Sequence, residues 1–210
     1  MRKVQNIKNQ VKYYFKKYGL LKTIKKIIYK LYLKIFRKEQ NSYNLNENEK
    51  YQLWIKNNEP NENELEEQRN AKFKINPKFS IIVPMYNTPV NFFEELVDCL
   101  INQTYANWEL CLADGSPEQN KELEQIIKKD ERIKYKFLNK NEGISGNTNE
   151  ALKLATGDYI ALVDHDDLIP SFCLYELANT INNHPEVEFI YTDEDKIMKT
   201  KENRCDPHFK

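Results

Sequence analysis

Three carboxylates lie within four residues of one another at the end of an apolar segment. Asp164, Asp166 and Asp167 directly follow residues 160–163, which read Ile-Ala-Leu-Val. On an extended backbone the side chains of Asp164 and Asp166 point to one side, and those of His165 and Asp167 point outward on the other. Two convergent carboxylates favour a hard cation such as Mg²⁺ or Mn²⁺, which completes its shell with water and phosphate oxygens. Because these acids repel one another without a cation, we favour a metal site at Asp164 and Asp166 over a helix cap by Asp166 or Asp167.

Three other turns carry residues that suit ligand contacts. Pro84, Tyr86 and Asn87 follow an apolar segment, and the Tyr86 ring either stacks on a base or packs under its own loop. Asp114 follows a second apolar segment, where it either accepts a hydrogen bond from a nucleoside or starts the next turn. Gly143 precedes a predicted helix whose N-terminal amides favour an anion such as a diphosphate.

An alternation of strands and helices from residue 79 onward must position these turns. The predicted strands are 79–83, 108–113, 133–138, 159–163 and 187–191, and the predicted helices are 90–102, 116–129 with Ser116 as N-cap, 146–155 and 170–182. This alternation predicts an α/β fold with a doubly wound, mostly parallel sheet and helices on both faces. Ligands of such sheets bind beyond the carboxyl ends of the strands, where the strand order reverses, so we expect the four turns to meet there.

The sequence lacks the motifs of several common sites. No Gly-x-Gly-x-x-Gly follows the first strand and no Gly-x₄-Gly-Lys-Ser/Thr occurs, which disfavours a Rossmann dinucleotide site and a P-loop. The three histidines are too far apart to form a zinc pattern. The cysteines form no Cys-x-x-Cys pair, so we predict reduced thiols at Cys99, Cys111, Cys173 and Cys205. A phosphatase of the haloacid dehalogenase type is also disfavoured. Those enzymes carry their Asp-x-Asp motif on the first strand, whereas Asp164 and Asp166 of this chain follow the fourth predicted strand.

The N-terminal segment differs in charge from the rest of the chain. The 210 residues contain 32 basic and 32 acidic side chains, yet residues 1–38 hold thirteen Lys and Arg and no acid. Apolar residues recur at three- and four-residue steps from Val4 to Phe36, which predicts a basic amphipathic helix. Such a helix suits the surface of an anionic membrane, and the alternative is that it packs on the globular part of the protein. Nucleic acid is a disfavoured partner because the chain is neutral overall and shows no recognition fold.

We therefore predict three parts: the basic helix 1–38, a polar linker 39–76 and a ligand-binding domain 77–210. Short helices are expected in the linker at 51–56 and 61–70, separated by Pro60. No apolar run reaches the roughly 18 residues that a membrane-spanning helix needs, and the start does not resemble a signal peptide. We expect a cytoplasmic protein that lies peripherally at the inner face of the cell membrane.

Five ordered segments together resemble the family 2 glycosyltransferases of GT-A fold, and more closely their bacterial O-antigen and rhamnosyl-type members. The segments are 79–89, 103–110, 141–149, 162–167 and 191–196, and residues 51–55 and 64–68 resemble the lead-in of this subgroup. The resemblance covers the chain from about Tyr51 to Lys210. It departs from the family at Thr148, near which many relatives carry Arg, and at Ala113, where many carry a second acid.

The resemblance implies an enzyme that transfers a sugar, with inversion, from a UDP- or dTDP-sugar to a cell-surface glycan or lipid-linked acceptor. It places Pro84, Tyr86, Asn87, Asp114 and Gly143 at the donor nucleotide, with Asp114 on the base. By the same resemblance Asp164 contacts ribose or metal, and Asp166 binds Mn²⁺ or Mg²⁺ on the diphosphate.

The end of the chain also bears on this interpretation. The resemblance places residues 206–210 mid-domain and the acceptor's general base beyond Lys210, so we expect a truncated form that binds the donor only. The alternative is a non-catalytic, membrane-peripheral component of a polysaccharide assembly system.

Overall fold

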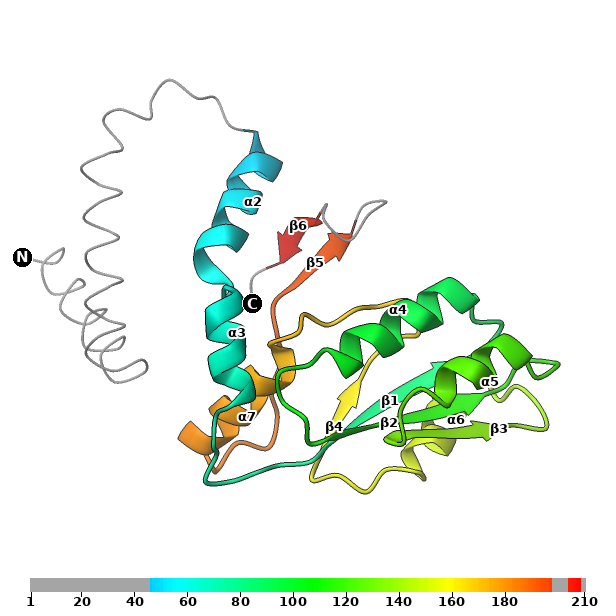
Figure 1. Ribbon diagram of the computed structural model, residues 1–210. Coiled ribbons are helices and arrows are strands. Elements are labelled where there is room, and N and C mark those ends of the chain that lie inside the picture. The colour runs from blue at the N-terminus through cyan, green and yellow to red at the C-terminus, as the bar shows by residue number, and fades with distance from the viewer. Residues whose placement is uncertain (1–45, 198–203, 209–210) are drawn as a thin grey trace, which may run out of the picture. The chain divides into compact units, whose positions relative to one another are not determined.

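The computed structural model describes residues 46–197 and 204–208 (Figure 1). The predicted basic helix 1–38 therefore lies outside the described residues. The chain divides into two compact units, of which one spans residues 58–193 and the other joins residues before 58 to residues after 193. Within the described ranges, no helix combines the length and the apolar character needed to cross a bilayer.

The larger unit is built on a four-stranded, fully parallel sheet. Its strands are β1 (Phe79–Met85), β2 (Trp108–Asp114), β3 (Ile133–Phe137) and β4 (Tyr159–Leu162). The order is β3-β2-β1-β4, so the chain winds outward from β1 in one direction and then returns to its other side. The predicted α/β class and the parallel, doubly wound sheet are confirmed.

Helices cover both faces of this sheet (Figure 1). Buried side chains of α4 (Val90–Ile101), α5 (Lys121–Ile127) and α7 (Cys173–Asn183) form one core with alternate residues of the strands, such as Ile81 and Val83. Ile82 faces the opposite side, where Ala151 of α6 (Gly143–Leu152) closes a smaller core. β1 is buried on both faces because it lies inside the sheet with helices on each side.

Helix α5 begins later than predicted. The expected N-cap at Ser116 is wrong, because the Ser116 hydroxyl oxygen accepts the Asn87 amide hydrogen at 2.8 Å instead of a helix amide. The Ser116 amide and hydroxyl both donate to Oδ1 of Asp114, at 2.9 and 2.5 Å. The helix starts at Lys121, and the Asn120 side chain accepts the Glu122 amide hydrogen at 2.9 Å. Ser116 thus belongs to the turn that follows β2.

The predicted strand over 187–191 does not form in the described part of the chain. Val187 and Ile190 pack against the core, but Phe189 is 80% and Tyr191 66% exposed, and no ladder pairs this segment. An apolar run becomes a strand only when a neighbour satisfies its backbone groups. The structure instead forms an antiparallel hairpin of β5 (Glu194–Ile197) and β6 (Arg204–His208), which was not expected from the sequence.

The smaller unit combines this hairpin with helix α2 (Glu47–Asn58). The buried Tyr51 hydroxyl donates to Oδ2 of Asp195 at 2.6 Å, and Nε of Arg204 donates to the same oxygen at 2.6 Å. Helix α3 (Glu62–Arg69) belongs to the larger unit, where Gln68 accepts a hydrogen bond from the Thr104 hydroxyl at 2.9 Å. The two short helices expected in the linker are therefore present, one in each unit.

None of the four cysteines forms a disulfide in the described residues. Burial raises the pKa of the Cys111 thiol to about 11, and the Glu109 carboxylate contributes to this increase. Burial likewise raises the pKa of Cys173 to about 11. Both groups are therefore protonated at neutral pH and are poor nucleophiles.

Candidate functional site

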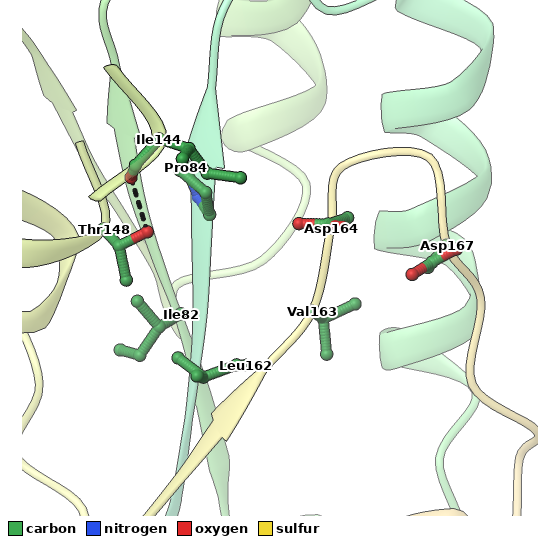
Figure 2. Close-up of a pocket in the computed structure, with 8 residues that line it drawn as sticks. All are labelled: Ile82, Pro84, Ile144, Thr148, Leu162, Val163, Asp164 and Asp167. Atoms are coloured by element: carbon green, nitrogen blue, oxygen red, sulfur yellow. Dashed lines mark hydrogen bonds between the residues drawn. The ribbon is translucent and has the colours of Figure 1, made fainter. Parts of the chain in front are cut away.

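Two adjoining hollows lie at the carboxyl ends of β1 and β4, where the strand order reverses. The larger, about 380 Å³, is here called the polar hollow after the amide, imidazole and carboxylate side chains in its lining, which includes Tyr86, Asn141, Gly143, Asn147, His165 and Asp166. The smaller, about 250 Å³, is the apolar hollow, lined chiefly by Ile82, Leu162, Val163 and Thr148 (Figure 2). Pro84, Ile144 and Asp164 line both. The position agrees with the rule for ligand sites in doubly wound sheets.

The acidic segment forms a turn rather than an extended strand end. β4 ends at Leu162, and the Asp167 amide donates to the Asp164 carbonyl at 3.2 Å. The predicted alternation of side chains is therefore wrong: Asp166 and the half-buried His165 line the polar hollow, while Asp167 lines the apolar one. Figure 2 shows Asp164 and Asp167 on the two arms of this turn.

The acids of this turn do not cap the helix that follows. α7 begins at Cys173, its N-cap is Phe172, and no side chain caps it. Asp164 and Asp166 are both exposed, and within residues 46–197 and 204–208 neither carboxylate hydrogen-bonds or pairs with another protein group. Their oxygens are therefore available to a ligand, and the alternative that Asp166 or Asp167 serves as a cap is wrong.

The carboxylate oxygens of Asp164 and Asp166 suit a hard cation that is also coordinated by a bound ligand. Among the described residues no three His, Cys, Asp or Glu side chains converge into a complete metal site. Asp164 and Asp166 provide only oxygen donors, which Mg²⁺ and Mn²⁺ accept, and these ions commonly take their other oxygens from water and phosphate. The residues present therefore fit a cation held jointly by protein and ligand.

The turn after β1 contributes one predicted contact residue to the polar hollow and holds a second outside it. Tyr86 lines the polar hollow and is 45% exposed, so its ring is accessible for stacking. Asn87 adopts a left-handed backbone with φ of 49°, and its amide donates to the Ser116 hydroxyl at 2.8 Å. Asn87 lines neither hollow, and its observed contact fixes the turn.

Asp114 is buried in the turn after β2 and lines neither hollow. It is 1% exposed, Oδ1 accepts both Ser116 donors, and Oδ2 accepts the Tyr135 hydroxyl at 3.0 Å. Burial raises the pKa of Tyr135, and the Asp114 charge beside its hydroxyl raises it further. These contacts give Asp114 the turn-forming role, and a contact with a base stays a prediction.

Gly143 begins α6, three residues before the predicted start. Its φ of 74° lies in the left-handed region, and its amide donates to Oδ1 of Asn141 at 2.9 Å. No atom lies within 4 Å of the position that a Cβ would take, so the backbone here is open toward the polar hollow.

Several residues of the hollows were not predicted. Asn141, Asn147 and His165 line the polar hollow, and Ile144 lines both. A signal existed for Asn147, which lies four residues before the buried Ala151 and is therefore a polar residue on the apolar face of α6. Sequence periodicity does not reveal which groups that amide contacts.

Comparison with known proteins places these residues within one family. Residues 80–205 match the profile of the family described as Glycosyl transferase family 2. Uncharacterized protein y4gI of Sinorhizobium fredii is 42% identical over 137 residues, which are 64% of this chain and 15% of that protein. O-antigen biosynthesis protein RfbC of Myxococcus xanthus is 25% identical over 163 residues, or 76% of this chain and 13% of that protein. This chain thus spans about 15% of the length of these curated relatives.

Among solved structures, S. aureus TarS 1-349 in complex with UDP is 31% identical to this chain with a TM-score of 0.47. The match covers 51% of this chain and 33% of that one.

Proposed function

Because this chain belongs to glycosyl transferase family 2, we propose that its larger unit binds the nucleotide diphosphate of an activated sugar together with Mn²⁺ or Mg²⁺. One observation carries the proposal: the Asp164 and Asp166 carboxylates are exposed at the polar hollow and, among the described residues, have no protein partner there. Two uncompensated acids beside a cavity favour a cation, and the cation in turn favours a diphosphate.

The proposed roles follow the positions of the lining residues. Asp164 and Asp166 hold the cation, Tyr86 stacks on the base, and Pro84 and Gly143 provide close backbone approach. Asn87 and Asp114 shape the nucleotide site through the turns that they form, and contact of the Asp114 carboxylate with the base requires it to exchange a present partner. When bound, the cation neutralises the charge that develops on the departing diphosphate.

For the whole protein we propose inverting transfer from a UDP- or dTDP-sugar to a glycan or lipid-linked acceptor. Family membership supports the transfer, and the relative named for O-antigen biosynthesis supports a cell-surface glycan as acceptor. None of the residues at the two hollows is assigned as the base that deprotonates the acceptor, so this proposal gives the described part of the chain donor binding alone.

Titration calorimetry of UDP in the presence of Mn²⁺ tests the donor site. We expect Asp164→Ala and Asp166→Ala each to weaken UDP binding at least about tenfold, which is about 1.4 kcal/mol. The matched control is Glu118→Ala, which removes an exposed acid that lines neither hollow and should leave affinity unchanged. Absence of UDP binding by the unaltered chain, or equal binding by all three variants, would contradict the proposal.

A second candidate role, a membrane-peripheral and non-catalytic component, is favoured by the thirteen cations and no acid in residues 1–38. The unaltered chain is expected to float with vesicles containing anionic lipid and to detach as salt rises, because the attraction is screened. Replacing the lysines of this segment by glutamine should abolish flotation. Equal flotation with neutral vesicles would remove the basis for this role.

A further inference from the structure

The polar hollow is supported from behind by a buried side-chain amide. Asn147 lies in the second turn of α6, is 2% exposed and contributes to the lining of the polar hollow. A buried amide must place both its N–H groups and its carbonyl oxygen, because each unpaired group costs about 1–3 kcal/mol. The groups that satisfy Asn147 lie at the end of β1 and in the loop before α6, so they belong to or directly adjoin strand-end loops.

Three hydrogen bonds link Asn147 to two of these loops. Its Nδ2 donates to the Met85 carbonyl at 3.3 Å, at the end of β1, and to Oδ1 of Asn141 at 3.1 Å. Its Oδ1 accepts the Glu142 amide hydrogen at 3.1 Å. The loop after β1 and the loop before α6 are therefore tied to the same amide.

The loop after β2 packs on this amide as well. A Cβ added to Gly115 would lie 2.7 Å from Nδ2 of Asn147 and 3.0 Å from the Asn141 Cα, so only glycine allows the present approach. The Gly115 amide donates to the Met85 carbonyl at 3.0 Å. That carbonyl therefore receives hydrogens from both the β2 loop and Asn147.

The proposed ligand contacts are covalent neighbours of the tied groups. Tyr86 directly follows Met85, and Gly143 directly follows Glu142. Both residues line the polar hollow. A change that frees the Met85 carbonyl or the Glu142 amide from Asn147 therefore lets Tyr86 and Gly143 shift. The ligand must then order these residues when it binds, and the free energy that this costs lowers the affinity.

We propose that Asn147 is a positioning residue whose buried amide sets the relative placement of three strand-end loops around the polar hollow. This inference rests on the proposed function, because the hollow is taken as the nucleotide diphosphate site. Asn147 acts through the backbone of Met85 and Glu142 and is not assigned a catalytic step.

The test compares Asn147→Ala with a matched variant of the same chemistry elsewhere. Asn182 of α7 also makes three hydrogen bonds through its amide, to the Ile75 amide and carbonyl and to the Ala178 carbonyl, at 2.8, 2.7 and 2.9 Å. It lines neither hollow. We expect both variants to lower the thermal midpoint, but only Asn147→Ala to weaken UDP binding with Mn²⁺, by about tenfold at a temperature well below both midpoints.

Two further variants keep the test decisive. Asn147→Thr nearly retains the volume and adds no charge that would itself repel a diphosphate, but it has one donor where the amide has two, so it should also weaken UDP binding at least tenfold even where the alanine variant fails to fold. Gly115→Ala disturbs the same loops from the other side, and its effect should be non-additive with that of Asn147→Ala.

The outcomes separate this inference from the function on which it rests. If the unaltered chain does not bind UDP, the proposed function fails. If it binds UDP and the folded Asn147 variants bind equally well, or if Asn182→Ala loses as much affinity, the positioning role is overturned while the proposed function stands.

Discussion

Glu109→Gln is expected to lower the free energy of unfolding by about 3 kcal/mol at neutral pH. Glu109 lies near the amino end of β2 and is 2% exposed. Its carboxylate accepts hydrogen bonds from residues of both neighbouring strands, β1 and β3, and from the segments beside them. Lys78 and Lys134 pair with Oε2, the latter at 2.9 Å, and the Thr156 hydroxyl donates to the same oxygen at 2.9 Å. Oε1 accepts the Thr156 amide at 2.5 Å and the Ser80 hydroxyl at 2.8 Å. One carboxylate therefore joins β1, β2, β3 and the loop that leads into β4.

The expected loss depends on pH in a defined direction. Burial by itself raises the pKa of Glu109, but hydrogen bonds from Lys78, Lys134, Thr156 and Ser80 outweigh burial and hold the pKa far below its usual value of 4.5. A lowered pKa in the folded state means that the stabilisation is fully present above about pH 5 and is lost as the pH falls below 4.5. The difference in stability between the unaltered chain and Glu109→Gln should therefore shrink in acid.

Urea unfolding of both proteins between about pH 3 and pH 7 measures this difference. The control is Glu94→Gln, because Glu94 is exposed and its carboxylate pairs with Nζ of the exposed Lys129 at 2.8 Å. An exposed pair contributes little to stability, so this variant should be indistinguishable from the unaltered chain. A Glu109 variant of unchanged stability, or a difference that grows as the pH falls, would contradict the assignment.

Gly157→Ala is expected to cost about 2–3 kcal/mol of folding free energy, because a methyl group has no room there. A Cβ at this position would lie 2.5 Å from the Lys78 carbonyl oxygen, 2.7 Å from the Ser80 hydroxyl and 2.9 Å from the Ser80 amide nitrogen. Two of these three atoms are backbone. The same Lys78 carbonyl accepts the amides of Asp158 and Tyr159, at 2.8 and 3.2 Å, where β4 begins to pair with β1.

Relief of this clash must move the start of β4 away from β1, because the inner strand β1 is held on both sides. Gly143→Ala provides the control, since its Cβ meets nothing within 4 Å and the cost of its left-handed backbone is only about 1 kcal/mol. Thermal unfolding of both variants measures the two costs. Equal losses would show that backbone conformation, not the close approach at Gly157, is the dominant effect.

The local features of the sheet could be predicted from sequence alone. β1, β2, β3 and β4 are short apolar runs bounded by turn residues, and their alternation with amphipathic helices indicated both the parallel sheet and the edge at which the two hollows lie. Period and turn chemistry are properties of neighbouring residues, so they can be read without knowing the fold. The ordered motifs likewise identified the family, which the profile match confirms.

Features that depend on distant partners could not be predicted in this way. The segment 187–191 has strand composition but no neighbour to pair with in the described chain. Ser116 is a residue type that is common at helix N-caps, but its hydroxyl oxygen accepts the amide hydrogen of Asn87, 29 positions away, instead of a helix amide.

The same distinction between local and long-range features applies to the candidate site. Sequence alone determined that Asp164 and Asp166 follow a strand and that Tyr86 and Gly143 lie in strand-end turns, because these are statements about short segments. Only the tertiary structure decided that the acids form a turn with Asp167 lining the neighbouring hollow, that Asp114 is buried, and that Asn147 ties the loops together. These outcomes depend on hydrogen bonds that include one between residues 62 positions apart, and such residues become neighbours only in the folded chain.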